Sequence, residues 1–427
     1  MNIKKSILLL LFLLICFLIF ILPFRNNLGI GVKIVNDSHD RHKYAVRGSW
    51  FSLSKIPYTE VFSEYPQVAT YFFALPYVLL ETIISRDKIL IDLSQISNVS
   101  HLPYPPRNIF LSNEIVHYYA VVFSFLMMVS SFLSISLLYE LRKNHKNLSL
   151  LLLLPASLYF TYNRYDIMPC FLSLLSLYLL SKKQYKMSAF VLSIGMLTKW
   201  YLLLLLPIFL TYYYSTHNKI NWSMIIIFSL TSFMIILPTL ISSGIDGLLV
   251  PYKFHFSRGV NNESLFYLIN YLSNKTLNTN ITNKFTFPLF FLLQLSIVPL
   301  CITSKILSFE KVIKWSALSI LIFMLFAKYY SPQWILWISP LLILDAIKRV
   351  DAIWIVLFDL ITYIYFPISY TVFGINSIVF YIIIVLKTIL IVKFTIPLFC
   401  ELIGDNTIFA FAQKHLIRQI KLRFSNE

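Results

Sequence analysis

Long apolar runs, separated by short polar segments, fill most of this chain. They span roughly residues 5–24, 114–138, 146–162, 166–181, 186–198, 200–214, 222–243, 286–304, 311–327, 332–346, 352–371 and 377–399. Only 13% of the 427 residues are charged and 58% are hydrophobic, with a mean hydropathy of +0.73. These features predict an all-α polytopic membrane protein with about 12 transmembrane helices in one integral membrane domain, residues 1–427. Several runs are shorter than about 20 residues, so some helices must be tilted, broken or packed inside the bundle.

The formal net charge of +17 does not indicate nucleic-acid binding in this chain. Much of the Lys and Arg lies in short segments between apolar runs, as in cytoplasmic loops. The four cysteines, Cys16, Cys170, Cys301 and Cys400, fall in or at the edge of apolar runs without metal-site spacing. We therefore expect neither disulfides nor a cysteine metal site.

Residues 68–85 decide the expected topology. With Lys4 and Lys5 in the cytoplasm, every basic loop and the basic tail 404–427 also lie inside, provided that 68–85 does not cross the membrane. We therefore expect 68–85 to be a re-entrant or interfacial helix, with both chain termini cytoplasmic. The outward-facing segments are then 25–113 (first outer loop), 163–166, 198–201, 244–285 (second outer loop) and 328–333.

The first outer loop carries two aspartates, Asp37 and Asp40, just after the first apolar run and just before an Arg-His-Lys run and Tyr44. Glu64 and Tyr65 follow in the same loop. A carboxylate held near a hydroxyl group can act as a general base, and a low-dielectric membrane surface can raise its pKa toward neutrality. The same residues also fit an ordinary solvated loop with scattered charges.

The other outward segments also carry charged or polar side chains: Arg164 and Asp166, then Lys199, then His255 and Arg258, then Lys328 and Gln333. Taken singly, each segment fits an interfacial hairpin with a snorkelling cation and an aromatic belt. Their gathering on one face favours a shared function instead. Cations close to a membrane suit a lipid-linked phosphate, and the guanidinium of Arg258 matches phosphate oxygens well.

The order and spacing of these motifs resemble the GT-C superfamily of membrane glycosyltransferases, most closely glycosyltransferase family 87, the polyprenol-phosphate-mannose-dependent mannosyltransferases. The resemblance covers roughly residues 30–345. It rests on Asp37 or Asp40 with Tyr44-Ala, Ile56-Pro-Tyr58, Glu64-Tyr65-Pro66, Asn163-Arg164-Tyr165-Asp166 with Pro169, Lys199, His255 with Arg258-Gly and Glu263-Ser264, and Ser331-Pro332-Gln333 with Trp337 and Pro340. The chain departs from the family at Gln67, where a second proline is usual.

The resemblance implies transfer of a hexose, mannose above all, from a polyprenyl or dolichyl phosphate to a glycolipid or glycan acceptor. Transfer would occur at the extracytoplasmic face, with inversion, in the plasma membrane or, in a eukaryote, the ER membrane. An outer-loop aspartate would be the catalytic base; Asp37, seven residues before Tyr44, fits the family spacing, and Asp40 lies nearer the cationic run. The implied donor and substrate site comprises Arg258, His255, Lys199, Arg164, Lys328, Glu64, Tyr65, Asp166 and Gln333. No cofactor or metal is required, although a divalent cation stays open.

Two other classes of function also fit a multi-spanning helical protein. A transporter or lipid flippase usually places charges near the bilayer midplane and carries internal repeats. Here the charges gather at one face, and the sequence shows no repeat. A ligase or oligosaccharyl transferase that moves a whole glycan usually needs a larger outer domain than these two loops.

Overall fold

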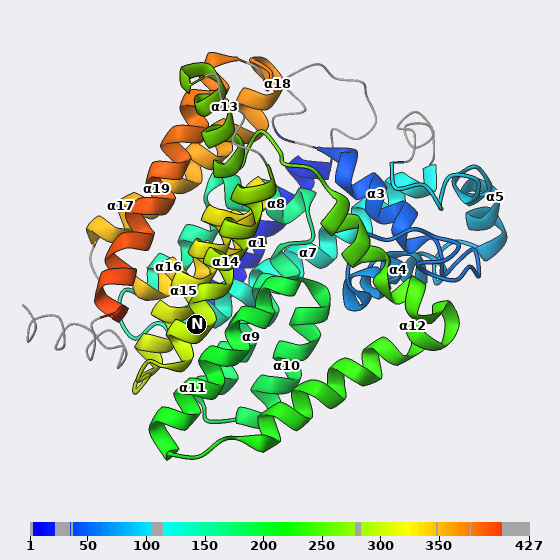
Figure 1. The fold of residues 1–427 in the computed structure, drawn as a ribbon. Coiled ribbons are helices and arrows are strands. Elements are labelled where there is room, and N and C mark those ends of the chain that lie inside the picture. The colour runs from blue at the N-terminus through cyan, green and yellow to red at the C-terminus, as the bar shows by residue number, and fades with distance from the viewer. Residues whose placement is uncertain are drawn as a thin grey trace, which may run out of the picture.

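The computed structural model describes residues 3–21, 35, 37–104, 114–277, 283–346, 349–375 and 377–403. Over these residues the chain is helical and contains no β-strand (Figure 1), so the expected all-α class is confirmed. The basic tail 404–427 and parts of both outer loops lie outside the described residues.

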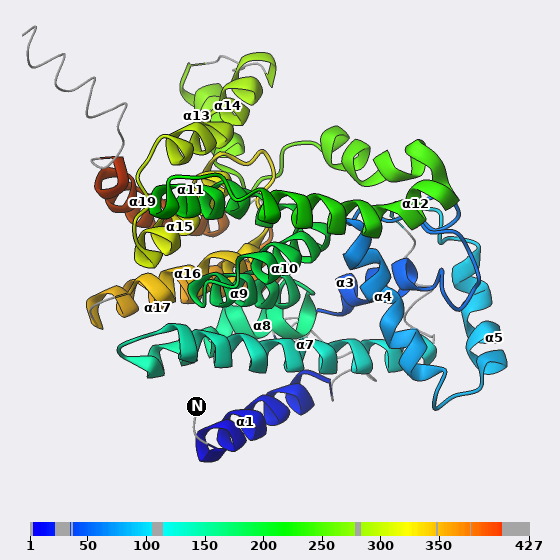
Figure 2. The same cartoon turned by 90° about the horizontal axis from the view of Figure 1, so that it is seen from below.

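The helices pack as a bundle with a smaller helical group at one side (Figure 2). Their bounds are α1 (Ile3–Ile21), α3 (Ser38–Gly48), α4 (Gln67–Leu80), α5 (Arg86–Ser97), α7 (Glu114–Leu141), η2 (Lys146–Leu153), α8 (Pro155–Asn163), α9 (Ile167–Ser181), α10 (Tyr185–Thr198), η3 (Trp200–Leu204), α11 (Leu205–His217), α12 (Trp222–Ser257), α13 (Leu265–Leu277), α14 (Asn283–Ile302), α15 (Phe309–Phe326), η4 (Pro332–Trp334), α16 (Ile335–Asp345), α17 (Arg349–Tyr363), η5 (Ile364–Ser369), α18 (Tyr370–Val372) and α19 (Ile378–Ile403).

Four of the described helices are long and apolar enough to cross a membrane: Glu114–Leu141, Trp222–Ser257, Val350–Val372 and Ile378–Ile403. They indicate an integral membrane protein in a lipid bilayer. The expected count of about 12 spans is not confirmed, because other apolar helices are shorter, among them Gln67–Leu80, Ile167–Ser181, Tyr185–Thr198 and Pro288–Ile302.

Local sequence explains several of the breaks that shorten these helices. Pro155 and Pro332 each occupy the first turn of a new helix, where a missing N–H costs nothing. α12 bends at Gly244, whose φ of 63° lies in the left-handed region that glycine adopts readily. Because α12 continues to Ser257 and α13 begins at Leu265, the expected second outer loop is mostly helical.

The described part of the first outer loop contains three helices, α3, α4 and α5, which pack as a group beside α7 (Figure 2). α3 lies so close to α4 that a Cβ added to Gly48 would sit 1.9 Å from the carbonyl oxygen of Phe73. The segment expected to be re-entrant or interfacial contains α4, whose 14 residues span about 21 Å. That length is less than the apolar core of a bilayer, about 30 Å.

The loops expected to be cytoplasmic meet at one end of the bundle. Arg142 donates to the carbonyl oxygens of Ile343 and Ala346 at the end of α16. Lys314, near the start of α15, pairs with Glu401 near the end of α19. These contacts join two pairs of segments that are far apart in sequence.

Candidate active site

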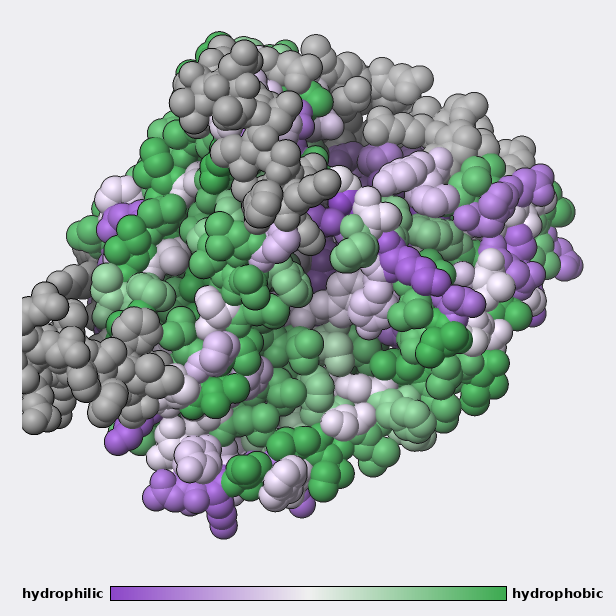
Figure 3. Space-filling model, in the orientation of Figure 1, coloured by the Kyte–Doolittle hydropathy of each residue, from purple (hydrophilic) through white to green (hydrophobic). Residues whose placement is uncertain are grey.

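A cavity of about 1400 Å³ opens among the segments that the sequence places on the outward face. Figure 3 shows hydrophilic side chains gathered in a hollow between largely apolar helices. Ten of the eleven predicted site residues line this cavity: Asp37, Asp40, Glu64, Tyr65, Arg164, Lys199, His255, Arg258, Lys328 and Gln333. The eleventh, Asp166, is fully buried and lies outside the lining. The structure therefore brings together residues that are up to about 300 positions apart in the sequence.

Three cations of the cavity sit where a helix ends. Arg164, Lys199 and Arg258 are the C-cap residues of α8, α10 and α12, and each has extended backbone angles. The extended conformation turns each side chain away from the helix line. A cation at this position also interacts favourably with the negative end of the helix dipole. The helix ends that interrupt the apolar sequence therefore place these three charged side chains in the site.

Asp37 and Asp40 lie at the N-terminal end of a helix, α3. Asp37 is the N-cap of α3, and one of its carboxylate oxygens accepts from the backbone N–H of His39 at 3.0 Å. The Asp37 backbone N–H donates to Asn163 Oδ1 at 3.0 Å, which ties the start of α3 to the end of α8. Asp40 follows in the first turn, where the helix dipole favours negative charge.

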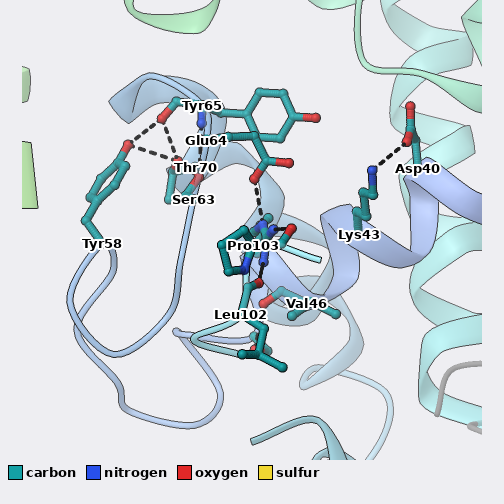
Figure 4. Close-up of polar contacts among 12 residues, drawn as sticks. Asp40, Lys43, Val46, Tyr58, Ser63, Glu64, Tyr65, Thr70, Leu102 and Pro103 are labelled. Atoms are coloured by element: carbon teal, nitrogen blue, oxygen red, sulfur yellow. Dashed lines mark hydrogen bonds and ion pairs between the residues drawn. The ribbon is translucent and has the colours of Figure 1, made fainter. Parts of the chain in front are cut away.

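Arg164 binds both aspartates. Its Nη2 donates to the second Asp37 oxygen at 2.8 Å, and its Nε lies 2.7 Å from an Asp40 oxygen. The other Asp40 oxygen is 3.7 Å from Lys43 Nζ, which is longer than a hydrogen bond (Figure 4). Both Asp37 oxygens therefore accept hydrogen bonds, whereas this Asp40 oxygen has no hydrogen-bond donor among the described residues.

The two aspartates are held ionised. Burial is the largest single influence and would raise the pKa of each carboxyl. Arg164 and the His39 backbone N–H together outweigh it at Asp37, and Arg164 with Lys43, His39 and Lys199 outweighs it at Asp40, so the pKa of both carboxyls is lowered. The expectation that the membrane surface raises their pKa toward neutrality is therefore wrong. Its error lies in treating the carboxylates alone, without the cation that shares their site.

Asp166 supports the cavity wall from behind. One of its oxygens accepts from Trp337 Nε1 at 2.8 Å and pairs with Lys199 Nζ at 2.9 Å. Lys199 also lies 4.3 Å from the centre of the Tyr165 ring and 5.4 Å from that of Trp337. Asp166 is predicted among the substrate-binding residues; in the structure it is fully buried and its carboxylate contacts Lys199 and Trp337.

Glu64 reaches the cavity, yet its carboxylate is already paired. Arg47, a fully buried residue of α3, donates to Glu64 at 2.7 Å and to the carbonyl oxygens of Leu102 and Pro103 at 3.1 and 2.9 Å (Figure 4). This contact joins three parts of the first outer loop. Tyr65 beside it packs edge-on against Tyr165 at 5.3 Å, joining the loop to the helix breaks.

The remaining predicted residues surround Arg258. Its guanidinium lies 3.4 Å from the centre of the Tyr329 ring, and it forms no ion pair within the part of the chain that the structure describes. His255 Nε2 contacts the Glu64 carbonyl oxygen at 2.9 Å, which only a protonated Nε2 can satisfy. Lys328 donates to the Phe256 carbonyl at 2.8 Å, and Gln333 accepts from Ser331 at 2.6 Å.

One part of the cavity is apolar. Its lining there consists of aromatic side chains of α14 and α15, namely Phe290, Phe291, Phe323 and Phe326. Phe291 and the neighbouring Leu292 are exposed at 51% and 62%. The site therefore combines ionic groups with an apolar aromatic wall.

A buried carboxylate absent from the predicted set supports the helix that carries Arg164. Asp359 of α17 accepts from the backbone N–H groups of Ala156 and Ser157 at 2.8 and 3.0 Å and from Ser157 Oγ at 2.7 Å. It caps the N-terminus of α8, whose own N-cap, Leu154, has no capping side chain. Sequence reasoning also missed Arg47. A lone Asp within an apolar run was the available signal for Asp359.

Within the described ranges, no group of three or more His, Cys, Asp or Glu residues is placed to hold a metal ion. The site's ionic character instead comes from cations and carboxylates on separate helix ends. No protein-family model matches the chain, and no curated protein matches its sequence.

Proposed function

We propose that this chain is a membrane glycosyltransferase that moves a hexose, mannose above all, from a polyprenyl or dolichyl phosphate to a glycolipid or glycan acceptor. The observation that carries the proposal is the content of the cavity. Two ionised aspartates, several cations and an apolar aromatic wall line a single space of about 1400 Å³. Pockets for small ligands are commonly about 300–1000 Å³, so this one has room for a sugar together with part of a lipid chain.

The leaving group in this reaction is a lipid phosphate, and Arg258 suits it best. Arg258 lines the cavity, projects from a helix end and forms no ion pair among the described residues. A guanidinium without a carboxylate partner can give its planar donors to phosphate oxygens. Lys199, which pairs with Asp166, and Lys328 add positive charge that stabilises the negative charge developing on the phosphate in the transition state.

Of the two aspartates, we assign Asp40 as the general base. Asp37 uses one oxygen to cap α3 and the other to hold Arg164. The Asp40 oxygen that lies 3.7 Å from Lys43 has no hydrogen-bond donor among the described residues, so it can accept a proton without breaking a helix cap. Asp37 then positions Arg164 and the start of α3. This reverses the preference drawn from its spacing to Tyr44.

In the proposed step, the acceptor O–H gives its proton to Asp40 while the oxygen forms a bond to the anomeric carbon. The bond between that carbon and the phosphate oxygen breaks on the opposite side, and the lipid phosphate leaves with the electron pair. Inversion follows from this in-line geometry. While Arg164 lowers the pKa of Asp40, the carboxylate is a weak base. A donor phosphate that draws Arg164 toward itself would make Asp40 more basic once the donor is bound.

The test is transfer from a labelled lipid-phosphate sugar by membranes that contain Asp40→Asn, Asp37→Asn or the double variant. A general base contributes about 10²–10⁴-fold, so Asp40→Asn should slow transfer at least about a hundredfold. Asp37→Asn should slow it less and should also lower thermal stability. Asp87→Asn, an exposed aspartate in the first turn of α5, is the matched control. Undiminished transfer by both single variants and the double variant would overturn the assignment.

The transporter or flippase alternative has one observation in its favour, since Asp359 and Lys387 are charged and buried inside candidate spans. Both charges have protein partners: Asp359 caps α8, and Lys387 donates to a backbone carbonyl. Neither residue lines the cavity. Uptake of a labelled lipid-phosphate sugar or free sugar by vesicles, without transfer, would favour the alternative.

A further inference from the structure

Lys387 lies in the middle of α19, a candidate membrane-spanning helix, and its side chain is only 1% exposed. Its Nζ donates to the backbone carbonyl of Glu263 at 2.9 Å. It also lies 3.4 Å from the centre of the Tyr330 ring and 5.0 Å from that of Tyr365. A charged residue at this depth is costly to bury and is a candidate for function by default. It has no part in the transfer step described above.

The two segments that Lys387 touches are already joined to each other. Asn261 uses its side chain to pair with the backbone of Tyr330: Nδ2 donates to the Tyr330 carbonyl at 2.6 Å, and Oδ1 accepts from the Tyr330 N–H at 3.0 Å. Asn261 Nδ2 also lies 3.2 Å from a Glu263 carboxylate oxygen. Residues 258–264 and 328–331 therefore form one unit, which we call the two-segment clamp.

This clamp carries three charged residues of the cavity: Arg258, Glu263 and Lys328. Arg258 rests on the ring of Tyr329, the residue next to Tyr330. Lys387 of α19 contacts both segments of the clamp, Glu263 on one and Tyr330 on the other. The clamp itself has no regular secondary structure between α12 and α13 or between α15 and η4, so side chains must fix its position.

We propose that Lys387 is a positioning residue that anchors the two-segment clamp to the membrane bundle and thereby orients Arg258 in the cavity. The Lys387 ammonium donates to the Glu263 carbonyl oxygen and contacts the face of the Tyr330 ring. These two contacts fix the position of the clamp relative to α19. Arg258 then meets the lipid phosphate from a fixed direction. The part concerning the phosphate rests on the proposed function, whereas the anchoring rests on these contacts alone.

The anchoring is tested with a spin label at Gly259, inside the clamp. A Cβ added to Gly259 meets no atom within 4 Å, so Gly259→Cys fits without strain. Cys400, an exposed cysteine, is first replaced by Ser, since the other three are buried. Lys387→Met should narrow the electron paramagnetic resonance spectrum of the label, because the clamp becomes mobile. Lys393→Met, which removes an exposed lysine of the same helix, should leave the spectrum unchanged. An unchanged spectrum in Lys387→Met overturns the anchoring.

The functional part is tested with the kinetics of a polyprenyl-phosphate mannose donor. Lys387→Met should raise KM for the donor at least about tenfold with a smaller change in kcat, since misplaced binding groups cost affinity first. In an Arg258→Met background, Lys387→Met should have little further effect, because both changes remove one interaction. Additive losses would overturn the link to Arg258 even if the spectrum changes. If the unmutated protein shows no transfer at all, the proposed function fails, and the spin-label result still decides the anchoring.

Discussion

Removing Glu64 should unfold the first outer loop rather than simply weaken substrate binding. The Arg47 side chain is fully buried, and the Glu64 side chain is only 9% exposed. Arg47 Nε lies 2.7 Å from Glu64 Oε2. Glu64→Leu would leave the Arg47 cation in a buried site with only two carbonyl partners. Breaking a buried ion pair by removing one partner costs about 3–5 kcal/mol, and we expect a loss of that size in the free energy of unfolding.

A double-mutant cycle separates the pair from its surroundings. Arg47→Met combined with Glu64→Leu replaces both charges by apolar groups, and such replacements are often near neutral. The double variant should therefore recover most of the stability that Glu64→Leu loses, with a coupling energy of about 2–3 kcal/mol. The assay is unfolding in mixed micelles of increasing denaturing-detergent fraction, followed by tryptophan fluorescence. If Glu64→Leu unfolds like the unmutated protein yet loses activity, Glu64 acts on substrate and the structural role is refuted.

Three further predictions concern the elements that hold the site in place. Asp359→Leu should lower the free energy of unfolding by about 2–5 kcal/mol, because two N–H groups and a hydroxyl of α8 lose their acceptor, while Ser157→Ala should cost about 1 kcal/mol; equal effects in the same micelle assay would contradict the capping role. Gly48→Ala should cost about 1–3 kcal/mol by forcing α3 from α4, and a retained melting temperature would show that the helices can separate at no cost. Burial, together with the nearby Arg41 and His117, lowers the pKa of His42 to about 3 from its ordinary 6.5. Below pH 6.5 the unfolded chain therefore binds a proton at His42 that the folded chain does not bind. The free energy of unfolding then falls as pH drops, by up to about 1.4 kcal/mol per pH unit. His42→Gln should flatten the pH dependence of the melting temperature between pH 6.5 and 4, and an unchanged slope would contradict this.

The apolar runs predicted the helices well, because burial of apolar surface and internal backbone pairing leave few other options for such segments. The number of spans did not follow, because several runs form helices shorter than a membrane span, and Pro155 divides the run 146–162 between η2 and α8. Gly244 had the opposite effect, because it bends α12 without ending it. Composition alone does not distinguish a kink from a loop.

The candidate site was predicted to the extent that its residues mark helix ends. Arg164 and Lys199 stood out because each lies between two apolar runs, and Arg258 because it is a cation in a loop next to the membrane; all three line the cavity. The partners of these residues could not be predicted, because they come from distant parts of the chain: Trp337 for Asp166, and Lys387 for the segment that follows Arg258. Pairing across more than a hundred residues depends on helix packing, which short motifs do not encode.

We propose above that a lipid phosphate is the leaving group of a sugar transfer in this cavity. It is tested most directly with purified protein in liposomes, a labelled polyprenyl-phosphate mannose and a crude glycolipid extract as acceptor. The account predicts release of free polyprenyl phosphate together with a glycoside of inverted anomeric configuration, at least about a hundredfold slower with Asp40→Asn. Folded protein that leaves mannose, glucose and other hexose donors intact, or that gives a product of retained configuration, would contradict it.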